Sequence, residues 1–234
     1  MLFKTSKHHN PVETLAENEL KAVSRRNFLG YFGGAAALMA TAAACKKDDA
    51  PSNTGVNLGS GDTGILNYAY ALEQLEAAFY TQVALTPYSG ITAAESSLLT
   101  DIRDHEIAHR EFFKAALAGN AIQALEVNFS SIDFSSRDSV LGTAKAFEDL
   151  GVTAYNGAGK LITTPDYLVL AGKIVSVEAR HAALIRDLIS NGSFADSTAI
   201  DANGLDLSRT PPQVLAIAAP FLKTALNASN LPTS

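Results

Sequence analysis

Apolar and polar residues recur with the period of an α-helix along most of the chain after residue 62. In the first such stretch, Asn67, Gln74 and Thr81 recur every seven residues on one face. The opposite face carries apolar side chains, namely Ile65, Leu72, Phe79 and Val83. This pattern predicts an amphipathic helix over residues 63–85.

Three further helices are marked by local start and stop signals. Thr92, followed three residues later by Glu95, forms a capping box, which predicts a helix that begins there and runs to residue 119. A third helix is expected over residues 138–162. A threonine followed by a proline at the first helical position opens a fourth, over residues 164–192, which ends at an Asn-Gly pair.

The lengths of the connections predict the topology. Short loops join the first helix to the second and the third to the fourth, so each pair is expected to form an antiparallel hairpin. The middle connection, residues 119–137, has about nineteen residues and can run the full length of a helix. The expected fold is therefore an all-α four-helix bundle with one long crossover between helices 2 and 3, plus a short C-terminal helix within residues 211–228.

Composition and charge exclude two classes of protein. The chain has 234 residues, 47% of them hydrophobic, and a net charge of -6. The positive charge is concentrated in residues 1–44, with five Lys or Arg against three Asp or Glu, whereas the remainder carries thirteen against twenty-one. An acidic body of this kind lacks the basic face that nucleic acid requires, so no nucleic-acid partner is expected. The single cysteine excludes a disulfide framework and a thiolate zinc site.

The first 44 residues have the organisation of an export peptide. Arg25 and Arg26 precede a mildly apolar run over residues 28–44, which is shorter than the ~20 residues that a membrane span needs. The paired arginines followed by Phe28 and Leu29 resemble the twin-arginine signal, which implies that a bacterium exports the protein already folded. The alternative is a membrane anchor that stays attached.

Cys45 follows three alanines, and this arrangement resembles a bacterial lipoprotein box. It departs from the usual box at Ala42, where a larger aliphatic residue is common; the alternative is an incidental cysteine. The resemblance implies a lipid on Cys45 and a location in the bacterial cell envelope. The expected organisation is thus a signal peptide over residues 1–44, a lipidated cysteine and flexible linker over 45–61, the bundle over 62–192, and a C-terminal extension over 193–234.

Two Glu-x-x-His motifs carry the candidate chemistry. Glu106 and His109 lie on the second helix, and Glu178 and His181 lie on the fourth. A spacing of three residues puts both members of a pair on one helix face, one turn apart. In both helices this is the apolar face. Because buried carboxylates are costly unless they are paired or bound to a cation, their placement needs an explanation.

The first and third helices supply two more carboxylates through an internal repeat. Glu73 is followed by Tyr80 and Glu148 by Tyr155, in each case seven residues later. Each repeat is followed by a helix with Glu-x-x-His, so two similar hairpins are expected to meet about a pseudo-twofold axis. Four carboxylates and two imidazoles that converge there form a site for two transition-metal ions.

Several residues near this site leave alternatives open. Glu76 also faces the core, and it is interpreted either as an extra or alternative ligand or as an exposed or structural residue. His105 precedes Glu106 on the same side and is a candidate to support a ligand by a hydrogen bond. The two tyrosines are interpreted either as redox-active or supporting groups or as core packing. A metal-free bundle remains the alternative, with the carboxylates neutralised by Arg103, Arg110 or internal water.

These motifs resemble those of the ferritin-like di-iron superfamily, over about residues 62–192, and are most similar to its exported branch of ferritin-like or desiccation-related proteins. The resemblance implies that Glu73 and Glu148 are terminal ligands, that Glu106 and Glu178 bridge the metals, and that a histidine caps each metal. Tyr80 and Tyr155 would support these ligands or take part in redox chemistry. The implied cofactor is two iron ions, with manganese as the alternative.

The expected function follows from this resemblance. We expect an exported di-metal protein that oxidises ferrous iron or reduces O₂ or peroxide, and so protects the cell envelope from stress. The alternative is a non-catalytic lipoprotein that binds metal for stability or serves in desiccation protection. A third interpretation is a component of an iron-handling assembly. We expect attachment to a membrane through Cys45, and a monomer or small oligomer.

Overall fold

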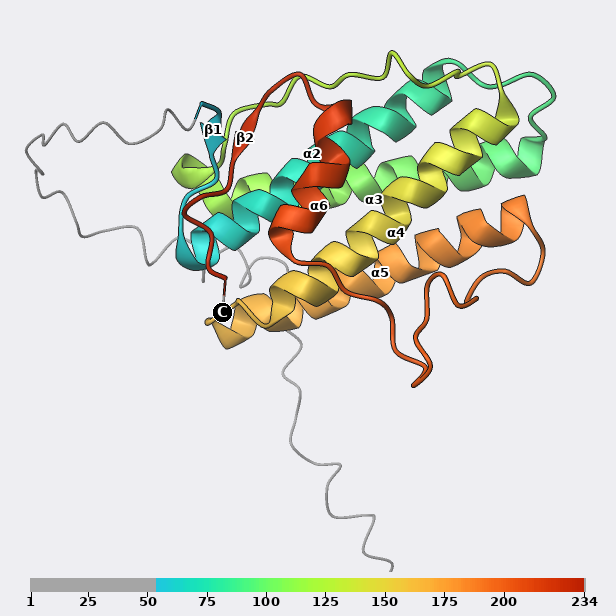
Figure 1. Ribbon diagram of the computed structural model, residues 1–234. Coiled ribbons are helices and arrows are strands. Elements are labelled where there is room, and N and C mark those ends of the chain that lie inside the picture. Colours follow the sequence, from blue (N-terminus) through green and yellow to red (C-terminus); the bar gives the residue numbers. More distant parts are fainter. Residues whose placement is uncertain (1–53, 234) are drawn as a thin grey trace, which may run out of the picture. The chain divides into compact units, whose positions relative to one another are not determined.

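The computed structural model describes residues 54–233. Arg25, Arg26 and Cys45, which carry the predicted export and lipidation signals, lie outside the described residues. The described part is mostly helical (Figure 1), with five α-helices and two short strands: β1 (Val56–Asn57), α2 (Gly61–Leu85), α3 (Ala93–Leu117), α4 (Arg137–Gly159), α5 (Pro165–Ile189), α6 (Pro211–Ala218) and β2 (Leu226–Asn227). None of the helices in residues 54–233 combines the length and the hydropathy needed to cross a membrane.

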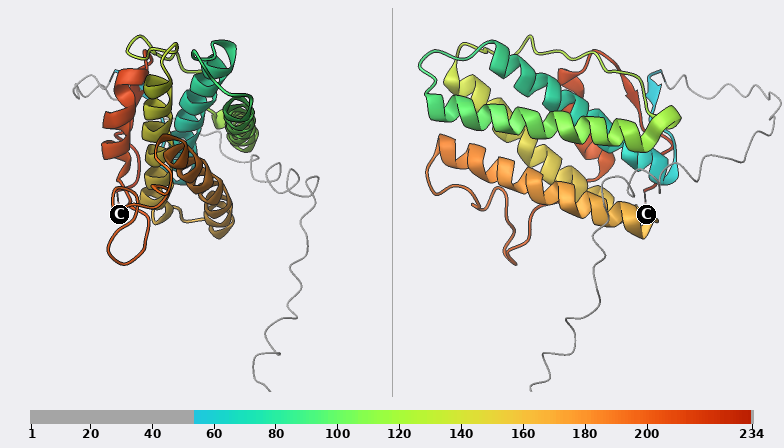
Figure 2. Two further views of the ribbon diagram at one scale, coloured as in Figure 1. Left: turned by 90° about the vertical axis from the view of Figure 1, so that its right-hand side faces the viewer. Right: turned by 180° about the vertical axis from the view of Figure 1, so that it is seen from behind.

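Four of the helices form the predicted bundle. α2 packs along α3, α4 packs along α5, and the two hairpins meet through α2 and α4 (Figure 2). The predicted all-α bundle with one long crossover between its second and third helices is therefore confirmed. The apolar faces of the four helices share one core, in which side chains such as Phe79, Leu141 and Ile185 are fully buried.

Local signals set the helix ends close to where the sequence places them. The Thr92 hydroxyl accepts a hydrogen bond from the Glu95 amide at 3.1 Å, and Glu95 accepts one from the Thr92 amide at 3.2 Å, which confirms the capping box. α5 begins at Pro165 after the N-cap residue Thr164, without a side-chain capping hydrogen bond, and the turn before it is held by another helix. Asp62, at the start of α2, accepts hydrogen bonds from the backbone amides of Thr163 and Thr164, both at 2.8 Å. This carboxylate links the two hairpins at one end of the bundle.

The polar face of α2 is buried, although its pattern suggests an amphipathic helix. Asn67 and Gln74 are only 2% and 8% exposed because the crossover lies on them. Asn67 accepts a hydrogen bond from the Ile122 amide at 2.9 Å, and Gln74 accepts one from the Leu125 amide at 2.9 Å. These amide side chains therefore satisfy the backbone of a segment that has little secondary structure of its own.

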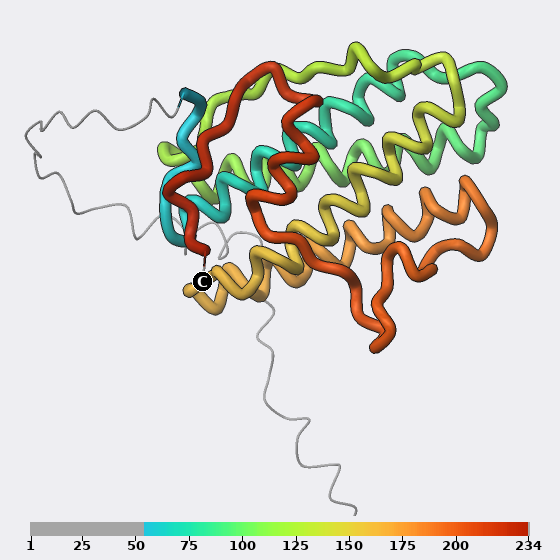
Figure 3. The backbone as a smooth tube through the Cα atoms, in the orientation of Figure 1, coloured from blue at the N-terminus to red at the C-terminus, as the bar shows by residue number. Residues whose placement is uncertain are grey.

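The N-terminal end of the described chain differs from the prediction, and it pairs with the C-terminal end. The expected flexible linker extends to residue 61, but Leu58 is fully buried and β1 pairs in parallel with β2. The short C-terminal helix predicted within residues 211–228 is confirmed as α6, which ends at Ala218. After a 3₁₀ turn, Ala219–Phe221, the chain is extended because it pairs with the crossover, as in the bridge between Val127 and Leu222, and then with β1 (Figure 3).

Candidate metal centre

Each helix of the bundle contributes acidic side chains to one point in the core. Glu73 comes from α2, Glu106 from α3, Glu148 from α4 and Glu178 from α5, and all four are 0% exposed. Each lies one or two helical turns from large apolar residues of the same face, so the packing of that face carries the carboxylate into the interior. The His181 side chain is 5% exposed and that of His109 is 13% exposed.

The six side chains form two overlapping groups of four. In each group every residue offers one nitrogen or oxygen atom, and these atoms all lie within 4.8 Å of one another. One group consists of Glu73, Glu106, His109 and Glu178, and the other of Glu106, Glu148, Glu178 and His181. Glu106 and Glu178 belong to both groups. The arrangement fits two cations that share two carboxylates.

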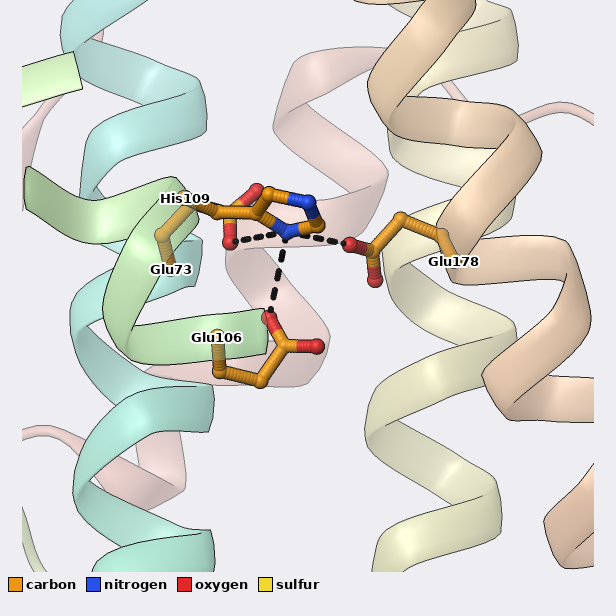
Figure 4. Close-up of side chains that lie close together, drawn as sticks. All are labelled: Glu73, Glu106, His109 and Glu178. Atoms are coloured by element: carbon orange, nitrogen blue, oxygen red, sulfur yellow. Dashed lines mark ion pairs between the residues drawn. The ribbon is translucent and has the colours of Figure 1, made fainter. Parts of the chain in front are cut away.

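The Nδ1 atom of each histidine is the one that faces the carboxylates. Nδ1 of His109 lies 3.0 Å from Glu178 Oε1, 3.4 Å from Glu73 Oε2 and 3.6 Å from Glu106 Oε2 (Figure 4). Nδ1 of His181 lies 2.8 Å from Glu106 Oε1 and 3.4 Å from Glu148 Oε2.

These contacts are short, but none of them has the geometry of a hydrogen bond. Both Nδ1 atoms and the facing oxygens are buried without a hydrogen-bond partner. Buried polar atoms are nearly always hydrogen-bonded, so several unpartnered atoms at one point need an explanation. The explanation is that these nitrogen and oxygen atoms are potential ligands that point toward a common centre rather than toward one another. Carboxylate and imidazole donors suit iron, manganese and other divalent transition metals, so the residues fit a metal pair.

Hydrogen bonding divides the four carboxylates into two kinds. The Tyr80 hydroxyl donates to Glu148 Oε1 at 2.5 Å, and the Tyr155 hydroxyl donates to Glu73 Oε1. Each of these glutamates therefore has one oxygen held by a tyrosine and one buried oxygen without a partner. In Glu106 and Glu178 both oxygens lack a partner.

The tyrosine contacts cross between the hairpins, which the sequence did not specify. Tyr80 on α2 binds a glutamate of α4, and Tyr155 on α4 binds a glutamate of α2. The seven-residue spacing within each repeat was the available signal. Two helical turns separate each glutamate from its tyrosine, so on antiparallel helices each tyrosine lies beside the glutamate of the other repeat.

Glu76 is buried, being 3% exposed, so an exposed role is excluded. It belongs to neither group of four. Its carboxylate lies beside α4 at Gly151. A Cβ added to Gly151 would lie 3.2 Å from Glu76 Oε1 and 3.1 Å from Glu178 Oε2. At corresponding positions, the first half of the repeat therefore has Glu76 and the second half has Gly151. The absence of a side chain at Gly151 leaves space for the carboxylates of Glu76 and Glu178.

The arginines proposed as alternative partners do not reach the buried carboxylates. Arg103 pairs with Asp104 at 2.8 Å, and Arg110 pairs with Glu111 at 2.8 Å, both at the surface. Within residues 54–233, the ion pairs of the four buried glutamates are made with His109 and His181.

Burial makes this concentration of acids costly without a metal. It raises the pKa of Glu178 well above its ordinary value, and the charges of Glu106 and Glu73 raise it further. Burial likewise raises the pKa of Glu73, to about 7, and those of Glu76 and Glu148. Metal cations would remove this cost, because they favour the ionised form of each ligand.

Three further groups have pKa values that are shifted against the effect of burial. Burial alone would lower the pKa of each histidine, but the carboxylates outweigh it and raise the pKa to about 12 for His109 and about 10 for His181. Burial would raise the pKa of Glu106, but both histidines outweigh it and lower that pKa to about 2.

These shifts predict how the stability of the metal-free protein depends on pH. Unfolded glutamate and histidine side chains lose their protons near pH 4.5 and 6.5, whereas most of the cluster keeps them to higher pH in the folded state. The folded state therefore binds more protons from about pH 4.5 to about pH 10, and its stability falls as the pH rises through this window. Glu106 opposes this trend only below about pH 4.5, where its lowered pKa makes stability fall with falling pH.

The measurement is the thermal unfolding midpoint by circular dichroism at pH 5.5 and pH 8. With a chelator present, we expect the lower midpoint at pH 8. With metal present, the difference should shrink or reverse, because metal binds the deprotonated ligands. A midpoint that rises with pH in chelator contradicts the assignment.

Comparison with known proteins agrees with the fold. The family model described as the ferritin-like domain matches residues 61–191. A search of the curated proteins finds no match to this sequence. The matched residues begin with α2 and end just beyond α5, and so contain the four helices that carry the buried carboxylates. The chain belongs to the ferritin-like domain family.

Proposed function

We propose that this protein binds two iron ions in the bundle and uses them to oxidise ferrous iron or to reduce O₂ or peroxide. A bound iron pair supplies two-electron redox chemistry toward these small substrates. The observation that carries the proposal is the set of buried, unpartnered atoms contributed by all six side chains. Manganese suits the same donors and is the alternative metal.

The hydrogen bonds support a specific role for each ligand. Glu106 and Glu178, whose oxygens are both unpartnered and which belong to both groups, would be shared by the two ions. Glu73 and Glu148 would each hold one ion through Oε2, because a tyrosine holds Oε1. His109 and His181 would each hold one ion through Nδ1. Glu76 lies outside both groups, so it is not assigned as a permanent ligand.

Tyr80 and Tyr155 orient the terminal carboxylates. Each hydroxyl holds one carboxylate oxygen and would leave the other available to a metal. Burial and the nearby carboxylates raise the pKa of both hydroxyls well above the ordinary value, so both stay protonated and act as donors.

The direct test supplies ferrous iron to the purified, chelator-treated protein in the presence of O₂ or hydrogen peroxide. We expect oxidation of the added iron at two ions per chain with consumption of the oxidant. Glu106→Gln should slow it by at least about tenfold, since glutamine offers one neutral, weaker oxygen donor in place of two carboxylate oxygens. The matched control is Glu111→Gln on the exposed face of the same helix. Tightly bound but inert metal would favour the non-catalytic alternative, in which the metal ties the four helices together.

We further propose that the protein is exported by the twin-arginine route and anchored in the bacterial cell envelope through a lipid on Cys45. The support is the order of the signals along the sequence, with paired arginines, an apolar run and the single cysteine. Incorporation of labelled fatty acid should disappear in Cys45→Ser. Undiminished incorporation in that variant would contradict the lipid anchor. A role in envelope stress or desiccation protection is consistent with this location.

A further inference from the structure

The internal repeat supports the two histidine ligands unequally. The repeat aligns Glu106 with Glu178 and His109 with His181. In the same register, His105 corresponds to Val177. An imidazole can accept a hydrogen bond, whereas a valine side chain cannot. The two halves of the site therefore differ at a position next to the ligands.

His105 contacts His181 directly. Its Nδ1 lies 2.9 Å from Nε2 of His181, and the two rings are almost parallel, with an interplanar angle of 10° and centroids 5.1 Å apart. Nδ1 of His181, on the other side of the ring, faces Glu106 at 2.8 Å. Nδ1 of His181 thus faces the carboxylates without a hydrogen-bond partner, and Nε2 contacts His105.

This contact suits the tautomer of His181 that can bind a metal through Nδ1. To bind a metal through Nδ1, His181 must carry its proton on Nε2, and that N–H donates to Nδ1 of His105. His105 then carries its own proton on Nε2. A hydrogen bond to the far nitrogen of a metal-binding histidine fixes the ring orientation and strengthens it as a ligand. No such acceptor is available from Val177 in the other half of the repeat.

The two ligands also differ in burial, since the His181 side chain is 5% exposed and that of His109 is 13% exposed. The more deeply buried ring is the one that His105 holds. A fixed orientation of the His181 ring and the exclusion of water both favour metal binding at this position. Each of them reduces the rearrangement of side chains and water that must accompany metal binding.

We propose that the two metal positions are inequivalent, and that the position capped by His181 binds its metal first because His105 holds that ring in the binding tautomer. This inference rests on the proposed function, since it assumes that the site binds two ions. His105 acts through His181 and is a positioning residue rather than a ligand.

The test titrates the full-length, metal-free protein with Co²⁺, followed by its visible absorbance and by calorimetry. We expect two binding steps whose dissociation constants differ by about tenfold or more. Glu148→Gln, which alters only the His181 group, should remove the tighter step. Glu73→Gln, which alters only the His109 group, should remove the weaker step and leave the tighter one.

His105→Phe keeps a stacked ring but removes the acceptor. It should weaken the tighter step by about 10–100-fold and change the weaker step little, so that the two steps merge. His105→Asn places a carbonyl oxygen near the position of Nδ1 and should restore two steps. Val177→Ala, at the corresponding position of the repeat, should leave both steps unchanged. His105 is exposed, so the unfolding midpoint of each metal-free variant should match that of the wild type.

Three outcomes overturn the inference. Two ions bound with one dissociation constant in the wild type would show equivalent positions. An unchanged tighter step in His105→Phe would remove the assigned role of His105. Loss of the weaker step in Glu148→Gln would reverse the order of binding. In each case the wild type still binds two ions, so the proposed function survives. Failure of the wild type to bind Co²⁺, Fe²⁺ or Mn²⁺ would defeat both proposals.

Discussion

Replacing Glu178 by glutamine is expected to stabilise the metal-free protein and to abolish its response to metal. Both oxygens of Glu178 are buried without hydrogen-bond partners, and burial holds its pKa well above the ordinary value. A neutral side chain of the same shape removes the cost of burying this acid. We therefore expect the free energy of unfolding in chelator to rise by about 1–3 kcal/mol.

Metal binding should change in the opposite direction. Glu178 belongs to both groups of four, and glutamine offers one ligating oxygen instead of two. The affinity for both ions should fall by more than the roughly 10–100-fold that loss of a supporting residue costs. Thermal unfolding with chelator and with added Fe²⁺ or Mn²⁺ measures both effects in one set of samples.

Glu111→Gln is the matched control, because Glu111 lies on the exposed face of α3 and pairs with Arg110 at the surface. It should alter stability by less than about 1 kcal/mol and leave metal binding intact. A Glu178→Gln protein that is less stable without metal, yet still stabilised by metal as in the wild type, would contradict the site.

Replacing Gly157 by alanine is expected to destabilise the protein strongly, although alanine is the better helix former. A Cβ added there would lie 1.7 Å from the carbonyl oxygen of Arg209 and 2.6 Å from its carbonyl carbon. The neighbour is backbone and is held in place, since the Arg209 amide donates to the Thr153 carbonyl at 2.9 Å and its guanidinium donates to the Thr153 hydroxyl at 2.8 Å. We expect a loss of about 3 kcal/mol in the free energy of unfolding, as the segment before α6 is forced away from α4.

Gly142→Ala in the same helix is the control. Nothing lies within 4 Å of a Cβ at Gly142, so only the helix preference changes and the variant should gain about 0.5–1 kcal/mol. Chemical denaturation of both variants and the wild type checks the pair. Equal stabilisation by the two substitutions would show that the segment before α6 does not pack on Gly157.

Most of the fold could be predicted from the sequence because its signals are local. Helical periodicity identified four helices and the connection lengths paired them, because hydrophobic faces and short loops act locally along the chain. The same periodicity turned the glutamates of both repeats inward, and the structure buries them completely. It did not identify the partners of the crossover, since Asn67 and Gln74 resemble solvent-exposed residues until another segment covers them.

The candidate metal site was likewise predictable from the sequence only in part. Glu-x-x-His spacing is a property of a single helix, so sequence alone brought Glu106 to His109 and Glu178 to His181. Whether an oxygen is free or held depends on an atom from another helix. The tyrosine contacts that distinguish Glu73 and Glu148 from the other two glutamates, and the contact of His105 with His181, therefore appear only after the hairpins pack.

The sequence by itself determined the helices, their hairpin pairing and the residue types directed into the core, because these follow from periodicity, capping and loop length. The tertiary structure alone decided which carboxylate oxygens stay unpartnered and how the C-terminal segment closes against β1 and the crossover. These features join residues 50 to 170 positions apart. Their geometry depends on the angle and register at which the helices pack, which no local pattern of residues specifies.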